Sequence, residues 1–464
     1  MSGTEEYDVI IIGTGPGGYV AGIRASQSGL KACVIEKDKP GGVCLNTGCI
    51  PTKSLIHQAE VFLSCREFEE MGITVDTQGL DYRKIFEKSR KASETLSKGV
   101  QFLLKKNNVP LINGHAQIVS PHEVHVDDGT IIKGNNIVIA TGSRPKELQG
   151  FEFDEEVILS STDALFLEEL PKKLIILGGG YIGCEFAFIM NAFGVEVIIV
   201  EMMEHILPME DTETVSVLAR SFRRKGITVM TNTRAIAIEK LSGIVSVTVE
   251  KNGGSRKVIE ADKMLVVVGR LPNTEDIGLD NIGLKTKNGF ISTGDYYQTA
   301  INGIFAIGDV IASPLLAHVA SKEGEIAVEY IAGLKPVPQI DPSSIPSAVY
   351  TEPQIGSFGI NENEAGENGI PYEKAVFSYR GNGKSVATGK VDGMIKVLYT
   401  PGTQEIIGAH VAGYNATELI HEILLAKTAG LKPENIAGMI HAHPTLSEVV
   451  MEVMRAVNGQ AIHM

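Results

Sequence analysis

The chain has 464 residues, of which 43% are hydrophobic and 21% are charged, and its formal net charge at pH 7 is -14. This length is too great for one ordinary core, so we expect roughly two to four domains, or one domain interrupted by another. The negative charge argues against nonspecific binding to nucleic acid or anionic lipid, because their phosphates require a basic surface.

Cysteine usage and the start of the chain bear on its location. The beginning, MSGTEEYDVIIIG, is acidic and lacks the basic and long apolar regions of a signal peptide. No apolar run approaches the roughly 18 residues that a membrane span requires. The five cysteines are an odd number for a secreted, disulfide-stapled chain. We therefore expect a cytoplasmic protein without membrane insertion, in which a specific cysteine pair is catalytic rather than structural.

The first motif is typical of a dinucleotide-binding unit. An apolar strand, three glycines, a helix, a second buried strand and an acid follow one another at 7–12, Gly13, Gly15, Gly18, 19–28, 32–35 and Glu36. Glycines allow the backbone to approach a pyrophosphate at a helix N-terminus, and a carboxylate after the second strand can accept hydrogen bonds from a ribose. One such motif alone is weak evidence, because glycine-rich turns are common.

The same motif occurs a second time. Its parts lie at 174–177, Gly178, Gly180, Gly183, a helix through Phe193, 195–200 and Glu201. The first glycine and the acid are 23 positions apart in both copies, so we predict two dinucleotide sites. At the second site we predict NAD rather than NADP, because a 2'-phosphate needs a nearby arginine and the loss of the acid. The alternative is that Glu201 is only a solvated acid at a strand end.

Two cysteines between the motifs are candidates for redox chemistry. Cys44 and Cys49 flank the permissive Gly48, where we expect a short loop that could close a disulfide exchanging with a bound flavin. A metal site is the alternative, but zinc usually takes four Cys or His ligands, and Cys65 has no partner at ligand spacing. We predict no metal site. Cys65 is expected to be inert, and two further cysteines are expected to pack in the core, Cys33 and Cys184.

Four other ionisable side chains are candidates, two near these motifs and two near the C-terminus. Lys53 lies one helical turn after Cys49, and if it is buried it needs an acid, for which Glu185 is the candidate. Near the C-terminus, His443 precedes Pro444, a good first residue of a helix that would carry Glu448. A histidine held by a carboxylate can act as an acid and base for a thiol; the alternatives are a structural histidine and an ordinary exposed lysine.

Taken together, the motifs resemble those of a known family. They are GTGPGG, GGVCLNTGCIPTKSLIH, ATGSRP, GGGYIGCE, GRLPN, FAIGDV, PLLAH and HAHPTLSE, and they cover essentially the whole chain. The sequence resembles the flavin-dependent pyridine nucleotide-disulfide oxidoreductases, and within that family the dihydrolipoamide dehydrogenases. Departures from the usual pattern occur at Val43, Thr47, Thr52 and the stretch 353–355; they put the tuning of the flavin in doubt, not the reaction.

The resemblance implies an α/β fold with two Rossmann-like domains, for FAD and NAD, and a C-terminal α+β dimerisation domain. The implied boundaries are 1–148 for the first part of the FAD domain, 149–277 for the NAD domain, 278–345 for the return to the FAD domain, and 346–464 for dimerisation. It also implies a homodimer with shared active sites, in which the partner's chain supplies the histidine that matches His443.

The resemblance assigns roles to particular residues. Cys44 would exchange with the substrate, Cys49 would contact the flavin, and His443 with Glu448 would manage protons. FAD would be held by Gly13, Gly15, Gly18, Glu36, Lys53, Ala116, Thr141, Gly142, Ser143, Asp309, Leu315, Leu316, Ala317 and His318. NAD would be held by Gly178, Gly180, Gly183, Glu185, Glu201 and Gly269, with Glu185 also pairing with Lys53 near the reactive edge of the flavin.

The implied reaction is oxidation of a dihydrolipoyl group on a lipoylated carrier domain of a 2-oxoacid dehydrogenase or glycine cleavage type system, with reduction of NAD. Glutathione and trypanothione reductases would need NADP-binding arginines near Glu201, and mercuric and large thioredoxin reductases carry extra C-terminal redox residues. NADH oxidases use one cysteine. Two alternatives remain: another FAD/NAD(P) disulfide reductase, and a non-catalytic scaffold subunit of a lipoyl complex. The intact Cys44, Cys49, His443 and Glu448 argue against a scaffold.

Overall fold

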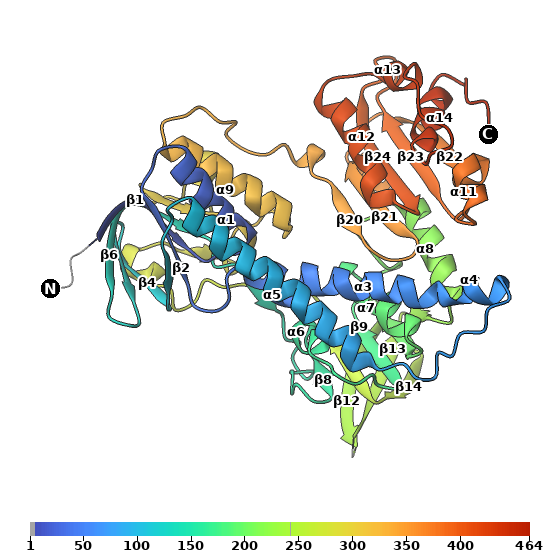
Figure 1. Ribbon diagram of the computed structural model, residues 1–464, viewed down its shortest axis with the longest axis horizontal. Coiled ribbons are helices and arrows are strands. Elements are labelled where there is room, and N and C mark those ends of the chain that lie inside the picture. Colours follow the sequence, from blue (N-terminus) through green and yellow to red (C-terminus); the bar gives the residue numbers. More distant parts are fainter. Residues whose placement is uncertain (1–4, 242) are drawn as a thin grey trace.

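A computed structural model describes residues 5–241 and 243–464 of the chain. Residues 1–4, which belong to the segment searched for a signal peptide, lie outside the described residues. The chain folds around three larger sheets, and Figure 1 shows each sheet in a separate region of the molecule, with the C-terminal one at the upper right. None of the helices in the described part of the chain is both long and apolar enough to cross a membrane.

The first sheet contains seven strands and combines the start of the chain with a strand far downstream. Strand β1 is parallel to its neighbours β2 and β6, and its residues Tyr7 and 9–12 are buried, as expected for an apolar strand covered on both faces. The strand order is β3 (Leu111–Asn113), β2 (Ala32–Glu36), β1 (Glu5–Ile12), β6 (Ile131–Ile139), β5 (Glu123–Val126) and β4 (Ala116–Ser120), with β19 (Ile304–Ala306) also pairing with β6.

Three helices accompany this sheet: α1 (Pro16–Gln27), α5 (Tyr82–Lys106) and α9 (Ala317–Ile331). Helices α1 and α9 pack side by side although they are far apart in the sequence (Figure 1). The chain therefore leaves the first sheet, builds the second one and returns.

The second sheet repeats the parallel arrangement in a smaller form. Its order is β11 (Thr228–Met230), β10 (Glu196–Val200), β9 (Lys173–Leu177), β15 (Lys263–Val266) and β8 (Ile158–Leu159). Its helices are α6 (Ser161–Leu165), α7 (Tyr181–Ala192) and α8 (Thr212–Arg224), and an antiparallel meander follows, made of β12 (Thr233–Leu241), β13 (Ile244–Lys251) and β14 (Arg256–Ala261). Both predicted strand–glycine–helix–strand units are confirmed.

The third sheet is antiparallel and belongs to the C-terminal part of the chain. Its order is β20 (Ser347–Val349), β21 (Gln354–Gly359), β24 (Ile406–Gly413), β23 (Met394–Tyr399) and β22 (Glu373–Ser378). Helices α12 (Ala416–Thr428) and α14 (Glu448–Ala456) pack against these strands, and α13 (Pro433–Ala437) packs against α14. Helix α8 of the second sheet also contacts β21, β23 and β24, so this sheet joins its own helices to the nucleotide-binding part.

Shorter elements connect these bodies. The cysteine segment forms α2 (Gly42–Thr47), α3 (Cys49–Leu63) and α4 (Cys65–Glu70), and α3 packs between α5 and α7. Others are β7 (Ser143–Pro145), β16 (Arg270–Pro272), β17 (Thr286–Lys287), β18 (Phe290–Ile291), α10 (Glu362–Glu367), α11 (Gly383–Ala387), η1 (Leu279–Ile282), η2 (Asp295–Tyr297), η3 (Gly308–Val310), η4 (Pro342–Ser344) and η5 (Tyr379–Gly381). The domain boundaries implied at 148, 277 and 345 stay predictions.

Two local predictions were wrong. The expected loop between the cysteines is instead two helices that meet at Gly48, where a Cβ would lie 2.9 Å from the carbonyl oxygen of Val43. Only glycine allows this close approach. The C-terminal helix begins at Glu448 rather than at Pro444, because the Glu448 carboxylate accepts the N–H of Thr445 at 2.9 Å and holds the preceding residues in a turn.

Candidate active site

The two glycine-rich turns have the same backbone geometry. Gly13 and Gly178 adopt φ angles of +103° and +110°, a region that other residues rarely enter. A Cβ on Gly18 would lie 2.0 Å from the oxygen of Gly13, and a Cβ on Gly183 would lie 2.0 Å from the oxygen of Gly178. The last glycine of each turn therefore lets the helix pack directly on the turn.

The middle glycine of each turn faces open space instead. Nothing lies within 4 Å of the position that a Cβ would take on Gly15 or on Gly180. Each is the N-cap residue of the following helix and brings no side chain to bond the N–H groups of the first turn. These donors and the positive end of the helix dipole suit a pyrophosphate that approaches the backbone. The residues present fit two dinucleotides.

The acids at the ends of the second strands are bonded to the turns. Glu36 accepts the backbone N–H of Thr14 at 2.9 Å, and Glu201 accepts that of Gly179 at 2.6 Å. The second oxygen of each carboxylate accepts a further N–H two residues along the chain, at 3.0 Å and 2.7 Å. Both acids are buried. Because a carboxylate oxygen has more than one lone pair, ribose hydroxyls can still bind there.

Cys44 and Cys49 lie on different helices, and their thiols are hydrogen-bonded to each other. Both are free thiols in this structure. The hydrogen bond from Cys44, helped by the charge of Lys53 and opposed by burial, lowers the pKa of Cys49 to about 7. The same hydrogen bond, together with burial, raises the pKa of Cys44. The pair is therefore asymmetric, with the more acidic thiol on α3 beside Lys53.

Lys53 forms the predicted pair with Glu185. Its Nζ donates to both carboxylate oxygens, at 3.0 Å and 2.9 Å, and lies 4.4 Å from the centre of the Tyr350 ring. Burial opposes the charge on Lys53, but Glu185 and the thiolate of Cys49 raise the pKa of the ammonium above its usual value. The backbone N–H of Tyr350 also donates to Glu185, at 3.1 Å. The pair thus joins α3, α7 and the start of the C-terminal part.

Ser143, Asp309 and Arg270 form a second polar cluster. The sequence did not mark Arg270 as a site residue. The hydroxyl of Ser143 donates to Asp309 at 2.5 Å, and Arg270 donates to the hydroxyl and carbonyl oxygens of Ser143 at 2.7 Å and 2.8 Å. Burial lowers the pKa of Arg270, while the charges of Asp309 and Cys49 act in the opposite direction. Its position beside Gly269 in GRLPN was the only signal in the sequence.

The remaining predicted cofactor residues are spread over three places. Thr141 and Gly142 lead into β7, which pairs with β16 immediately after Gly269, and the Thr141 hydroxyl donates to the carbonyl oxygen of Asn273 at 2.6 Å. Ala116 begins β4 and is buried in the core of the first sheet. Residues 315–318 lead into α9 and are partly exposed. Their roles toward a cofactor stay predictions.

His443 and Glu448 pair with each other but lie away from the cysteines of the same chain. His443 Nδ1 is 3.0 Å from Glu448 Oε1, and the histidine side chain is 75% exposed. Figure 1 shows the α13–α14 end of the C-terminal region well separated from the start of α3. Backbone donation by Thr445 and the hydrogen bond from His443 lower the pKa of Glu448 against the effect of burial. The carboxylate is thus available to hold the imidazole.

The other three cysteines differ in their surroundings. Cys33 and Cys184 are fully buried, which confirms their predicted place in the core. The Cys184 sulfur lies 3.3 Å from the carbonyl oxygen of Gly179, and burial raises the pKa of its thiol. Cys65 is partly exposed at the start of α4.

Comparison with protein families agrees with this arrangement. Residues 7–324 match the pyridine nucleotide-disulphide oxidoreductases, and residues 345–454 match the dimerisation domain of the same family. The chain belongs to the pyridine nucleotide-disulphide oxidoreductase family and carries its dimerisation domain.

Individual relatives narrow the comparison. A dihydrolipoyl dehydrogenase of Bacillus subtilis is 41% identical over 99% of both chains, and the mitochondrial dihydrolipoyl dehydrogenase of Pisum sativum is 40% identical over 100% of this chain and 93% of its own. Among solved structures, LpdA of Mycobacterium tuberculosis superposes with a TM-score of 0.89 at 26% identity, over 97% of this chain and 99% of that one. The predicted family, fold class and oxidoreductase activity are confirmed.

Proposed function

We propose that the protein is a dihydrolipoyl dehydrogenase that oxidises protein-bound dihydrolipoyl groups through Cys44 and Cys49 and reduces NAD. The observation that carries the proposal is the placement of the thiol pair. Cys49 shares α3 with Lys53, which is bonded to Glu185, whereas Cys44 lies on a separate short helix. Relatives named dihydrolipoyl dehydrogenase at 41% and 40% identity support the substrate class.

FAD is proposed to bind the first glycine turn and NAD the second. When bound, FAD would supply an acceptor for the two electrons of the dithiol and a hydride donor to NAD. Gly13, Gly15 and Gly18 would hold the FAD pyrophosphate, with Glu36 at a ribose. Asp309 and Ser143 offer a partly buried polar cluster that would suit the polar side chain of a flavin. Gly178, Gly180, Gly183 and Glu201 would hold NAD.

The thiol chemistry balances within the chain and the substrate. In the oxidised protein Cys44 and Cys49 form a disulfide. A dihydrolipoyl thiolate attacks the sulfur of Cys44 and releases Cys49 as a thiolate, which Lys53 stabilises. The second thiolate of the same dihydrolipoyl group then attacks the lipoyl sulfur of the mixed disulfide. The lipoyl ring closes as a cyclic disulfide, and Cys44 leaves as a thiolate with the bonding electron pair. Two electrons have then moved from the substrate to the cysteine pair.

Protons are proposed to move through His443 of the partner subunit. Glu448 fixes Nδ1 of the imidazole at 3.0 Å, so Nε2 is left to take the proton of a dihydrolipoyl thiol and later to return one to Cys44. The 75% exposure of the histidine in a single chain fits a residue that a second copy covers. The dimerisation domain at 345–454 supports this arrangement.

Steady-state turnover with purified protein tests the proposal. A flavin absorption spectrum and reduction of NAD by free dihydrolipoamide are expected. A flavoprotein that fails to oxidise dihydrolipoamide but reduces another disulfide with a nicotinamide cofactor would contradict the proposal, and a colourless, inactive protein would favour a scaffold subunit.

The identity of the lipoyl carrier requires a separate experiment. Kinetics against a panel of purified lipoylated domains, from 2-oxoacid dehydrogenase and glycine cleavage type systems, would rank the carriers by kcat/KM. The net charge of -14 favours a carrier with a basic docking patch. The cytoplasmic location stays a prediction.

A further inference from the structure

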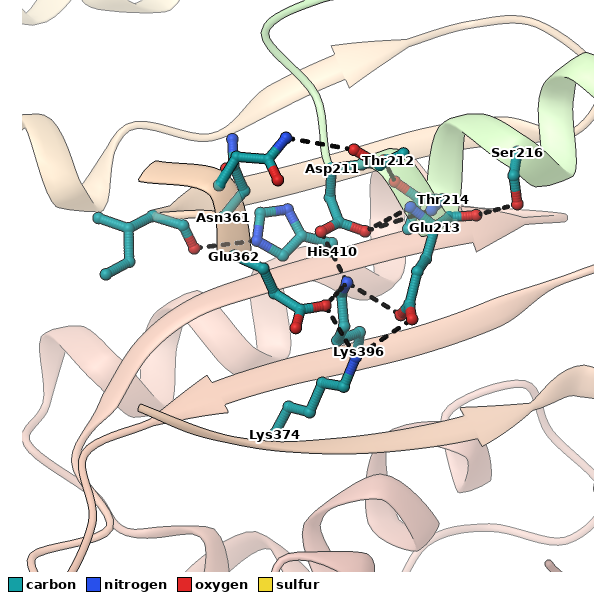
Figure 2. Close-up of polar contacts among 12 residues, drawn as sticks. Asp211, Thr212, Glu213, Thr214, Ser216, Asn361, Glu362, Lys374, Lys396 and His410 are labelled. Atoms are coloured by element: carbon teal, nitrogen blue, oxygen red, sulfur yellow. Dashed lines mark hydrogen bonds and ion pairs between the residues drawn. The ribbon is translucent and has the colours of Figure 1, made fainter. Parts of the chain in front are cut away.

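A cluster of charges around a buried lysine lies outside the proposed active site, between α8 and the C-terminal sheet (Figure 2). At its centre is Lys396 of β23, whose side chain is 0% exposed. Its Nζ lies 2.6 Å from Asp211, 3.0 Å from Glu213 and 2.6 Å from Glu362. An ammonium has three N–H donors, and here it has three carboxylate partners. Lys374 reaches Glu213 and Glu362 from the exposed side. We call these five residues the Lys396 cluster.

The Lys396 cluster connects two parts of the chain. Asp211 and Glu213 belong to the start of α8, whereas Lys396 and Glu362 belong to the C-terminal part. Asp211 is also the N-cap of α8, and accepts the N–H groups of residues 213 and 214 at 3.1 Å and 3.3 Å. One carboxylate therefore both begins the helix and binds Lys396. Without the ammonium, this buried charge would lose its partner.

Lys396 is also the end of a polar row across the C-terminal sheet. Lys396 is the register partner of His410, His410 of Ser357, and Ser357 of Ser347. Register partners point to the same face of a sheet, so this row lies on the face that meets α8 and the loop before it. Such a row on a buried face needs polar partners from the other side.

Those partners lead back to the second nucleotide turn. Glu210, which precedes Asp211, is 3% exposed. Its carboxylate accepts the hydroxyl of Ser357 at 2.7 Å and the hydroxyl of Tyr181 at 2.6 Å. The Tyr181 hydroxyl is also 3.4 Å from that of Ser347. Two members of the row therefore make these contacts: Ser357 binds Glu210, and Ser347 lies next to the Tyr181 hydroxyl.

Tyr181 lies directly after the second nucleotide turn, on the helix that also carries Glu185. It is the first residue of α7 and follows the open Gly180. Glu185, one helical turn further and therefore on the same face of α7, binds Lys53 at 2.9 Å. A shift of residues 210–211 would therefore move the side chain that directly follows Gly180 of the second glycine turn.

We propose that Lys396 is a positioning residue for the pyridine nucleotide: it fixes residues 210–211, and through Glu210 it fixes Tyr181 beside the second glycine turn. This inference rests on the proposed binding of NAD at that turn. Lys396 itself touches neither nucleotide nor cysteine. Glu185 is held by Lys53 and by the backbone of Tyr350 and not by the polar row, so Lys396 acts on nucleotide affinity and not on the exchange between the dithiol and the cysteine pair.

The Lys396→Met variant tests this proposal in the FAD-loaded dimer. Methionine keeps an unbranched apolar stem but removes the ammonium. Calorimetric titration with NAD is expected to give a Kd raised by about fivefold or more. The anaerobic rate at which dihydrolipoamide reduces the flavin, a step without nucleotide, is expected to stay within about twofold of the unaltered protein. An unchanged Kd for NAD would overturn the proposal, as would equal losses in both measurements.

Two further variants make the result decisive. Lys374→Met is the matched control, because it removes an ammonium that binds Glu213 and Glu362 but not Asp211; its Kd for NAD should be unchanged, and an equal rise there would overturn the role of Lys396. If Lys396→Met does not fold, Ser357→Ala decides, since it removes only one hydrogen bond to Glu210. A rise of about twofold or more in the Kd is then expected, and no rise would contradict the proposal. Unaltered protein that fails to use dihydrolipoamide would instead reject the proposed function.

Discussion

Cys44 and Cys49 are chemically different thiols because their surroundings differ. Cys49 lies on the helix that carries Lys53, and the hydrogen bond from Cys44 lowers its pKa to about 7 from an ordinary value of 9. The same hydrogen bond raises the pKa of Cys44, so a proton added to the pair resides there. This difference is consistent with the proposed exchange at Cys44, which leaves the charge on Cys49 beside Lys53.

Substitution of each cysteine tests the assignment at the residue scale. In anaerobic reduction, Cys44→Ser is expected to keep the long-wavelength band of a thiolate in contact with flavin, and Cys49→Ser to lose it. Cys44→Ser keeps a hydroxyl donor, whereas Cys44→Ala removes the main cause of the lowered pKa. The band needs the Cys49 thiolate, so it fades as the pH is lowered through the pKa of Cys49. In Cys44→Ala this pKa moves up from about 7, and the band should therefore be lost at a higher pH than in Cys44→Ser. Loss of the band in Cys44→Ser alone would exchange the two roles.

Glu201 leads to a prediction about the choice of nucleotide. Its buried carboxylate is held by two backbone N–H groups, so it cannot turn away from a 2'-phosphate. Loss of one charge-assisted hydrogen bond, worth about 1.5 to 3 kcal/mol, corresponds to at least a tenfold preference for NAD over NADP in kcat/KM. Steady-state kinetics with both nucleotides measures it, and similar values would refute the assignment.

At the scale of elements, two glycines of the second turn have different tasks: we expect Gly183 to matter for stability and Gly180 for nucleotide binding. Gly183→Ala would place a Cβ 2.0 Å from the oxygen of Gly178, and we expect it to lower the free energy of unfolding by about 1 to 3 kcal/mol. Gly180→Ala meets nothing within 4 Å, so its Tm should change little while its Kd for NAD rises about tenfold or more through overlap with the pyrophosphate. Thermal melts and NAD titrations of both variants are the measurements. A stable Gly180→Ala variant that binds NAD normally would contradict the proposal that NAD binds at this turn.

These elements also show what the sequence can predict. Both nucleotide units were predictable because the strands, glycines and acids act locally, within a few tens of residues. The Lys53–Glu185 pair was predictable because a buried ammonium needs an acid. The helix around Cys44 and the late start of α14 were not, because each depends on a contact that propensity does not encode: the approach of Val43 to Gly48, and the hydrogen bond from Thr445 to Glu448.

Contacts between distant segments were the least visible in the sequence. Arg270 reaches Ser143 across the junction between the two nucleotide-binding sheets, and Lys396 reaches Asp211 from another sheet. Neither residue lies in a pattern that reveals its partner, since a lysine in a strand is ordinarily solvated. Only the fold brings these charges together and buries them.

At the scale of the whole molecule, the cysteine pair and His443 of a single chain lie far apart, although the proposed chemistry needs both. The cysteines lie on α2 and α3, and α3 packs between α5 of the first sheet and α7 of the second. His443 is 75% exposed in the segment between α13 and α14, two helices that Figure 1 shows well apart from the start of α3. A two-fold dimer formed through the dimerisation domain would bring His443 of each chain to Cys44 of the other, because such an interface is reciprocal.

Mixed dimers test whether the active site is shared. Cys44→Ser and His443→Gln proteins, each nearly inactive as a homodimer, are co-expressed with different tags and purified as the hybrid. If the site is shared, one site of the hybrid carries both lesions and the other carries neither, so activity should return to about half of that of the unaltered dimer. If His443 serves Cys44 of its own chain, each site of the hybrid carries one lesion and the hybrid stays inactive. Homodimers of each variant, mixed after purification without subunit exchange, are the control and should show no recovery.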